Sequence, residues 1–164
     1  RQQGFKPKVI TLGKALLFPG AIEALGELGD GLTTEVWWSP SHPFASSLTR
    51  QSAQALAQAY ETATGKQWTQ PIGFAHALFE VAADALRRAK SPNAADVRDA
   101  VAATSVNTVV GPVKWGGKGP FKNVSKTPLV LGQWGKGKKF KYELSIVNNI
   151  AAPKIPLTGN LRLI

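Results

Sequence analysis

Trp37-Trp38-Ser39-Pro40-Ser41-His42-Pro43 is the stretch that decides the fold. Proline fixes its own φ angle and favours an extended conformation in the residue before it, so Pro40 and Pro43 together exclude a helix here. The stretch lies between a strand-like segment and a long helical segment. We therefore interpret it as a hinge between two parts of the molecule, with Ser39 and Pro40 as hinge residues.

A second break in the pattern is expected after the helices, at Thr108–Pro112, with Thr108 and Gly111 as hinge residues. A chain that leaves one body, builds part of another and then returns indicates two lobes with a cleft between them. The outer blocks are predicted to be rich in strands and the middle block to be helical. The two breaks divide the chain into residues 1–38, 39–108 and 109–164.

The composition fits an α/β protein with one ordinary core, because 43% of the 164 residues are apolar. The sequence contains no cysteine, which excludes disulfides, thiolate catalysis and cysteine-based zinc sites. With two histidines and no clustered carboxylates, we expect no metal and no cofactor. Ser39, Ser41 and His42 are too close together along an extended segment to constitute a catalytic triad, and we do not expect an enzyme.

The formal charge of +10 is concentrated near the carboxyl-terminal end. Residues 112–164 carry ten Lys and Arg residues and one acidic residue, Glu143. From Lys139 to Ile146, lysines alternate with apolar residues, which predicts a strand with one solvated and one buried face. We interpret the lysines as a solvated face, and a basic module that binds nucleic acid is the alternative.

Local signals predict where the helices begin and end. Gly65 is expected to stop the first long helix, Pro71 to open the next, and Asn93 to cap a third, with Asp96 in a capping-box-like position. The predicted helices are 21–28, 46–64, 71–89 and one that begins at Asn93. The predicted strands are 8–12, 31–38, 109–115, 129–134 and 140–147, with a turn at 135–138. The inward face of the 71–89 helix is expected to carry Phe74, Leu78, Val81, Ala82, Ala85, Leu86 and Ala89.

The beginning of the chain resembles the end of a helix that passes into a buried strand. Gln2-Gln3-Gly4 reads as a helix end with a glycine cap, and Lys8–Leu12 reads as the strand that follows. A buried strand of this kind normally pairs with parallel neighbours, which would come from an earlier segment. We therefore expect the chain to begin within a domain.

Several short motifs occur in a fixed order along the chain. They are Gly4-Phe5-Lys6-Pro7-Lys8, Gly29-Asp30-Gly31, Trp37-Trp38-Ser39-Pro40 with Pro43, a long helix ending at Tyr60 and Gly65, an Ala/Leu helix at 74–89, Val110-Gly111-Pro112-Val113-Lys114-Trp115, and Gln133-Trp134. In their order and spacing they resemble the branched-chain amino-acid type of periplasmic solute-binding protein. The resemblance covers nearly the whole chain, but only the carboxyl-terminal half or less of such a protein.

The resemblance implies the two-lobed α/β type I periplasmic-binding fold. Residues 1–38 and 109–164 would belong to the carboxyl-terminal lobe and residues 39–108 to the amino-terminal lobe, with crossovers near the two breaks. It also implies a bacterial extracytoplasmic receptor, periplasmic or lipid-anchored, that closes on a small ligand and delivers it to an ABC permease. The remaining amino-terminal portion of the same protein is the other implied partner, and no nucleic acid is expected.

The resemblance also indicates which residues contact the ligand. Lys14, Leu17 and Phe18 lie in the expected cleft loop, and Phe74 and His76 lie at the start of the Ala/Leu helix. Related receptors use a carboxylate in this loop for the ligand ammonium, but no acid occurs from residue 13 to residue 22. This departure disfavours an ordinary amino acid and favours an anionic group near Lys14.

An aromatic pocket wall from Trp37, Trp38 and Phe74 is a further possibility, and His42 is expected on the hinge surface. The ligand classes considered are amino acids, amides and aromatic or other carboxylic acids. A ligand-sensing regulatory domain of the same fold is the remaining alternative.

Overall fold

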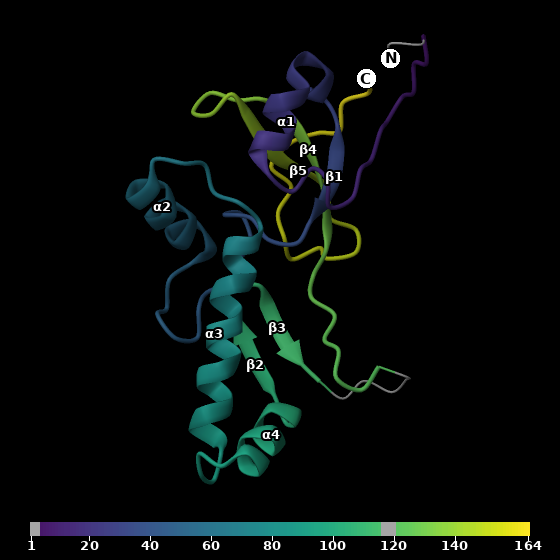
Figure 1. The fold of residues 1–164 in the computed structure, drawn as a ribbon. Helices are drawn as coiled ribbons and strands as arrows, with labels where there is room; N and C mark the ends of the chain where they lie inside the picture. The colour runs from purple at the N-terminus through teal and green to yellow at the C-terminus, as the bar shows by residue number, and fades with distance from the viewer. Residues whose placement is uncertain (1–3, 116–120) are drawn as a thin grey trace.

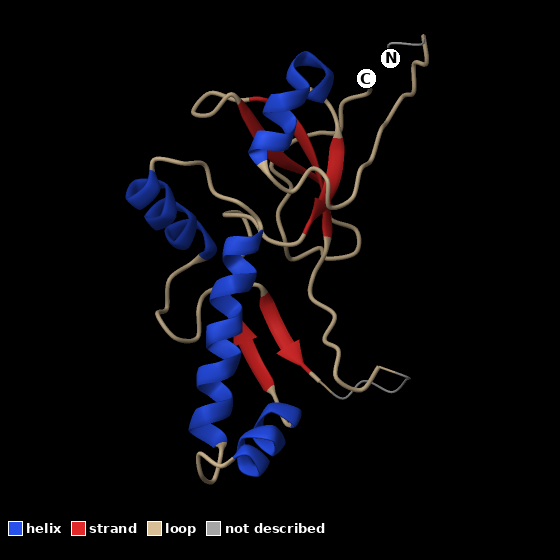
Figure 2. Cartoon of the chain, viewed as in Figure 1, coloured by secondary structure: helices blue, strands red, loops and turns tan. Residues whose placement is uncertain are grey.

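The computed structural model describes residues 4–115 and 121–164 and shows two bodies of secondary structure (Figure 1). Gln2 and Gln3 of the expected helix end lie outside the described ranges. The sheet body contains α1 (Pro19–Leu25), the short 3-10 helix η1 (Gly26–Gly29), β1 (Thr33–Val36), β4 (Val130–Lys136) and β5 (Tyr142–Asn148). The helical body contains α2 (Ala53–Thr64), α3 (Pro71–Arg88), α4 (Ala94–Ala102), β2 (Ser105–Thr108) and β3 (Gly111–Lys114). Figure 2 shows the long helices in one body and strands in both.

The sheet body is built on an antiparallel sheet with the strand order β1-β4-β5. The predicted strand at 8–12 is present only as an extension of this sheet, through a parallel bridge between Thr11 and Thr33. The Thr33 N–H donates to the Ile10 carbonyl at 2.9 Å, and the Leu12 N–H donates to the Thr33 carbonyl at 3.0 Å. The extension is short because the described residues provide no strand on its other side.

Two aromatic side chains fasten α1 and η1 to the sheet. Trp134 and Tyr142 are buried in one cluster with Leu16, Ile22 and Leu32. The Trp134 indole N–H donates to the Leu16 carbonyl at 2.9 Å, and the Tyr142 hydroxyl donates to the Gly26 carbonyl at 2.8 Å. Each ring therefore combines apolar burial with a satisfied polar group, as is usual for buried Trp and Tyr residues.

Trp38 belongs to the core of the helical body although it follows a strand of the sheet body. Its side chain is fully buried, and its ring packs edge-on against Trp68 with 6.0 Å between centroids. A Cβ atom placed on Gly73 would lie 2.3 Å from the Trp38 ring. Glycine is therefore required at position 73, because α3 passes directly over the indole.

The second expected break is part of the helical body. β2 and β3 pair antiparallel, with Thr108 opposite Gly111, so Thr108 and Gly111 form the tight end of a hairpin. The Thr108 hydroxyl donates to the Gly111 carbonyl at 2.8 Å, and Val109 and Val110 are buried in the helical core. The chain passes back to the sheet body only after Lys114, between β3 and β4. This position differs from the crossover predicted at Thr108–Pro112. The difference arises because Val109 and Val110 of the turn are buried in the core of the helical body.

The helix boundaries follow the predicted signals except at the start of α2. Gly65 ends α2 with φ 67°, Pro71 opens α3, and the Asn93 side chain caps α4 by accepting from the Asp96 N–H. α2 begins at Ala53, with Ser52 as its cap, and not at Ser46 or Ser47 as predicted. The Ser46 hydroxyl oxygen instead accepts from the Leu48 and Thr49 N–H groups, which folds this segment into a turn.

The β4–β5 hairpin is shifted from its predicted position. β4 continues to Lys136, and the turn lies between Lys136 and Tyr142, so Phe140 is a turn residue and not the strand residue that was predicted. The Glu143 carboxylate organises the turn by accepting from the N–H groups of residues 138, 139 and 140. β5 is an edge of the sheet within the described residues, and the lysines in this turn suit an exposed edge.

The face of α3 differs from the predicted inward face. Leu78 and Leu86 are 67% and 60% exposed, and the neighbouring Phe79 is 68% exposed. The buried positions on α3 are Gly73, Ala77, Glu80 and Ala85, of which Ala85 was predicted. Phe74 and Val81 also pack against the core as predicted. The helix therefore presents large apolar side chains to solvent. No helix within the described ranges is both long and apolar enough to span a membrane.

A fully buried carboxylate connects three segments of the helical body. Glu80 accepts from the Val109 N–H at 2.9 Å, and it also accepts from the N–H and the hydroxyl of Ser47. Its bonds hold α3 against the β2–β3 turn and against the segment before α2. Because a carboxylate is a strong acceptor, these bonds satisfy donors that water cannot reach.

We predict that Glu80→Ala lowers the free energy of unfolding by about 3 kcal/mol, because it leaves the buried Val109 N–H without an acceptor. Glu80→Gln retains one acceptor oxygen, so we expect it to lose less stability than Glu80→Ala. Urea unfolding measures both changes. Glu23→Ala, at an exposed position of α1, is the control and should change stability by no more than about 0.5 kcal/mol. Equal stability of Glu80→Ala and the parent would contradict the prediction.

Candidate ligand-binding cleft

Gln70 connects the two bodies at the hinge. Its side chain is fully buried immediately before α3, where its amide oxygen accepts from the Trp37 N–H at 2.7 Å. Its amide NH₂ group donates to the Glu35 carbonyl at 3.1 Å. The end of β1 is thereby fixed to the start of α3. Sequence reasoning missed Gln70, and its only local signal is a polar residue directly before the helix-opening proline.

The hinge segment itself is a tight turn closed by a buried histidine. The Ser39 N–H donates to His42 Nδ1 at 3.1 Å, the Ser39 hydroxyl lies 2.9 Å from the same nitrogen, and the His42 N–H donates to the Ser39 carbonyl. Burial lowers the pKa of His42 to about 4. The predicted surface position of His42 is therefore wrong. Ser39 supplies the partners of Nδ1, while Nε2 is buried without a hydrogen-bond partner in the described residues.

The loop that follows the 8–12 segment brings a lysine and a carboxylate together. Lys14 has φ 46°, and its N–H donates to Glu35 Oε1 at 3.2 Å. The loop itself contains no acid, so the carboxylate comes from β1. A pocket of about 290 Å³ lies beside Glu35, with Thr11 and Asn148 as other polar side chains and with a mostly apolar wall. Sequence reasoning missed Glu35, since its contact with the loop joins residues 21 positions apart.

Phe74 is held against the aromatic residue that enters the hinge. The rings of Trp37 and Phe74 pack edge-on with 6.1 Å between centroids, and both side chains are partly exposed. Gln70 bonds the main chain of both residues that flank Val36, Glu35 and Trp37. A series of contacts therefore runs from Lys14 through Glu35 and Trp37 to Phe74 at the junction of the two bodies.

The other predicted ligand contacts lie elsewhere. Leu17 is buried, and Phe18 precedes α1 and borders a separate pocket with Tyr60 and Phe140. His76 Nε2 lies 2.7 Å from the Ser46 hydroxyl. That hydroxyl oxygen already accepts from two backbone N–H groups, so its own proton is donated to His76 Nε2. This bond fixes the imidazole ring against the turn before α2.

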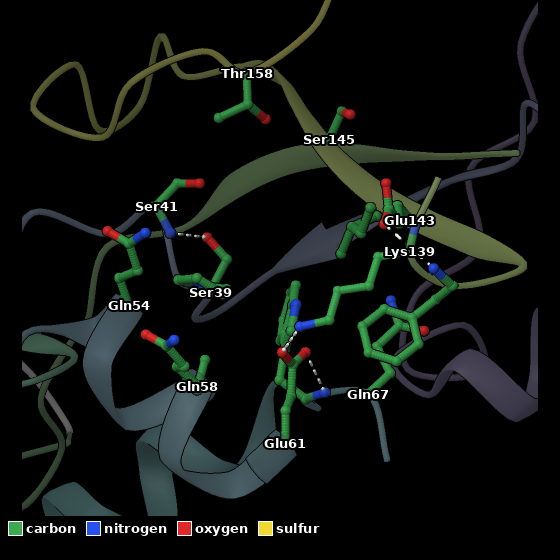
Figure 3. A pocket seen from close by; sticks show the side chains of 15 residues that line it. Ser39, Ser41, Gln54, Gln58, Glu61, Gln67, Lys139, Glu143, Ser145 and Thr158 are labelled. Carbon is green, nitrogen blue, oxygen red and sulfur yellow. Dashed lines mark hydrogen bonds and ion pairs between the residues drawn. The ribbon is translucent and has the colours of Figure 1, made fainter. Parts of the chain in front are cut away.

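A cleft with a volume of about 490 Å³ lies between the bodies, bordered by α2 and the β4–β5 turn (Figure 3). Ser39 and Pro40 of the hinge line it, but the five predicted ligand contacts do not. Two contacts bridge this cleft. Lys139 Nζ lies 2.7 Å from Glu61 Oε2, and the Gln67 side-chain NH₂ donates to the Tyr142 carbonyl at 3.0 Å. Within residues 4–115 and 121–164 no group of three His, Asp or Glu side chains could hold a metal ion.

Comparisons with known proteins place the chain in a family with this architecture. The sequence profile of the family described as periplasmic binding protein matches residues 1–139, and the chain belongs to that family. Its fold is the mixed α/β type I periplasmic-binding fold expected from the sequence, of which the chain is a part. A search of curated proteins found no match.

Three solved structures illustrate the similarity. A leucine-binding protein LivK from Thermotoga maritima has a TM-score of 0.70 at 20% identity, covering 92% of this chain and 39% of that one. LivJ from Streptococcus pneumoniae, in complex with isoleucine, has a TM-score of 0.66 at 16% identity, covering 89% and 39%. A solute-binding protein from R. palustris, in complex with benzoate, has a TM-score of 0.52 at 18% identity, covering 85% and 36%. The chain thus spans about two fifths of the length of these proteins.

We predict that His42 makes stability depend on pH. Burial lowers its pKa in the folded chain to about 4, from the ordinary value of 6.5. The contribution of the neutral imidazole to the free energy of unfolding is therefore fully present above pH 6.5 and is lost as the pH falls toward 4, because His42 of the unfolded chain takes up a proton at a higher pH than His42 of the folded chain. Between pH 7 and pH 5 the loss is about 2 kcal/mol. Urea unfolding at both values should show a smaller difference for His42→Asn than for the parent. An equal pH dependence in the two proteins would count against a buried neutral imidazole.

Proposed function

We propose that this chain is part of an extracytoplasmic receptor that closes on a small solute and delivers it to an ABC permease. The supporting observation is the junction at Gln70, where a short hinge joins the bodies and where successive contacts connect Lys14, Glu35, Trp37 and Phe74. Membership of the periplasmic binding protein family supports a periplasmic or membrane-anchored extracellular location. Hinge closure of two bodies around a ligand is an established way to sequester it.

The side chains at the junction favour an amino acid with an apolar or aromatic side chain. The Glu35 carboxylate supplies the group for an ammonium that the loop lacks, and Trp37 and Phe74 supply an apolar wall. The sequence alone disfavoured an amino acid because no acid occurs in the loop, and the position of Glu35 reverses that argument. An aromatic carboxylic acid is the second candidate, because the exposed Lys14 lies on the same loop.

The amino-terminal portion of the same protein is the proposed structural partner. The exposed Leu78, Phe79 and Leu86 form an apolar face on α3, and the 8–12 segment offers its outer edge for a further parallel strand. Apolar faces of this kind are ordinarily covered. The proposed portion would complete the sheet body beside residues 8–12, complete the helical body over α3, and supply the rest of the ligand site.

The structure weakens the alternative of a nucleic-acid-binding module. Several basic residues near the carboxyl-terminal end pair with carboxylates, as Lys136 does with Glu27 at 2.8 Å and Arg162 with Asp30 at 2.9 Å. A hydrogen bond to Glu27 and its negative charge raise the pKa of Lys136. Lysines that are paired with carboxylates contribute less to phosphate binding than unpaired lysines do.

We predict that the complete protein binds leucine or phenylalanine saturably and with little dependence on salt, and that the ligand raises its melting temperature. Calorimetric titration measures the affinity. Glu35→Gln should weaken amino-acid binding by at least about thirtyfold, because it removes the partner of the ammonium. Glu23→Gln, on α1, is the matched control and should bind like the parent.

Binding of benzoate that is unaffected by Glu35→Gln would favour the aromatic-acid candidate instead. If no amino acid, aromatic acid or amide binds, and DNA binds with a steep dependence on salt, the receptor proposal is wrong.

We also predict that residues 1–164 expressed alone are poorly soluble, and that co-expression with the amino-terminal portion restores a soluble complex. Size-exclusion chromatography of the two preparations provides the measurement. A stable monomer of the 164-residue chain that melts cooperatively would refute this prediction.

A further inference from the structure

The cleft between α2 and the β4–β5 turn is separate from the residues proposed to bind the solute. Its volume of about 490 Å³ falls within the range of small-molecule sites. Its walls come from the hinge, α2, the segment that joins α2 to α3, β5 and the tail that follows β5. Lys14, Glu35, Trp37 and Phe74 do not line it. The cleft therefore needs an explanation of its own.

Gln67 leaves a buried acceptor at the floor of this cleft. The side chain is 9% exposed, and its NH₂ group is held by the Tyr142 carbonyl at 3.0 Å. Its amide oxygen has no hydrogen-bond partner in the part of the chain that the structure describes. A buried acceptor without a donor costs free energy, so a molecule in the cleft that supplies an O–H or N–H group would be stabilised.

Further neutral polar side chains line the same cleft as Gln67. Gln54 and Gln58 project from α2 on one side of the cleft, while Ser145 of β5 and Thr158 lie on the other side (Figure 3). None of the contacts drawn among the lining residues reaches Gln54, Gln58 or Ser145. These amides and hydroxyls can both donate and accept. They fit a ligand that carries several hydroxyl groups.

The charged groups in the cleft already have partners within the protein. Lys139 pairs with Glu61, whose other oxygen accepts from the Trp68 N–H at 3.3 Å. The Glu143 carboxylate accepts from backbone N–H groups of the β4–β5 turn. An anionic ligand would meet a lysine that is already paired, together with an excess of carboxylates. The cleft is therefore suited to an uncharged molecule.

Two aromatic side chains complete the lining. The rings of Trp68 and Phe140 border the cleft from opposite bodies. Aromatic faces pack against the C–H groups of a sugar ring, while neighbouring amides bond its hydroxyls. We propose that this cleft is a second binding site, which takes an uncharged polyhydroxylated molecule of monosaccharide size.

The test is calorimetric titration of the complete protein with D-glucose, D-xylose and myo-inositol, and with glucuronate as the charged counterpart. We expect saturable binding of at least one neutral probe, and at least about tenfold weaker binding of glucuronate. The double variant Gln54→Ala/Gln58→Ala should weaken binding of the neutral probe by about tenfold. Both positions are exposed on α2, so the variant should retain the melting temperature of the parent.

Asn107→Ala is the matched control, because it removes an exposed amide from β2 and should leave sugar affinity unchanged. The affinity for the solute of the proposed receptor should be the same in the double variant and the parent, which separates the two proposals. The proposal is overturned if none of the neutral probes saturates, if glucuronate binds as tightly as they do, or if the double variant binds like the parent.

Discussion

The packing of Trp38 under α3 is the interaction on which the arrangement of the two bodies depends. β1 ends at Val36 in the sheet body, and two residues later the Trp38 indole is buried in the core of the other body. Glycine at position 73 lets the helix backbone approach that ring closely. A substitution that moved either group would displace α3, and with it Gln70 and Phe74, from the end of β1.

The contacts that join the bodies differ in how strongly they constrain them. Gln70 is fully buried and satisfied on both sides, so it fixes the junction at β1. The pair of Lys139 and Glu61 spans the bodies with the lysine mostly exposed, and exposed pairs contribute roughly 0–1 kcal/mol. Gln67 also spans the bodies, by donating from a buried position to the Tyr142 carbonyl. The buried amides of Gln70 and Gln67 therefore hold the bodies together more firmly than the exposed ion pair does.

The sequence predicted the features that depend on neighbouring residues. Gly65, Pro71 and Asn93 bound their helices as expected, since a glycine stop, a proline start and an asparagine cap act within one turn. The two-body arrangement followed from the prolines of the hinge and from the order of motifs in the family. These signals are local or cumulative, and they do not require knowledge of which distant segments meet.

The features that were missed depend on distant contacts. Glu35 meets the loop at Lys14 across 21 residues, and Gln70 meets Trp37 across 33. The buried position of His42 depends on a turn that presents both the N–H and the hydroxyl of Ser39 to one ring nitrogen. The exposed face of α3 looked like a core face because periodicity shows which residues share a face, but not whether another segment covers it.

The unequal burial of the tryptophans has a consequence for spectroscopy. Trp38 and Trp134 are enclosed in separate cores, whereas Trp37 is partly exposed and packs against Phe74 at the junction. A soluble quencher of fluorescence can therefore reach the Trp37 indole, whereas the indoles of Trp38 and Trp134 are shielded by their cores. The emission of the chain thus separates the enclosed tryptophans from the partly exposed one at the junction without any attached dye.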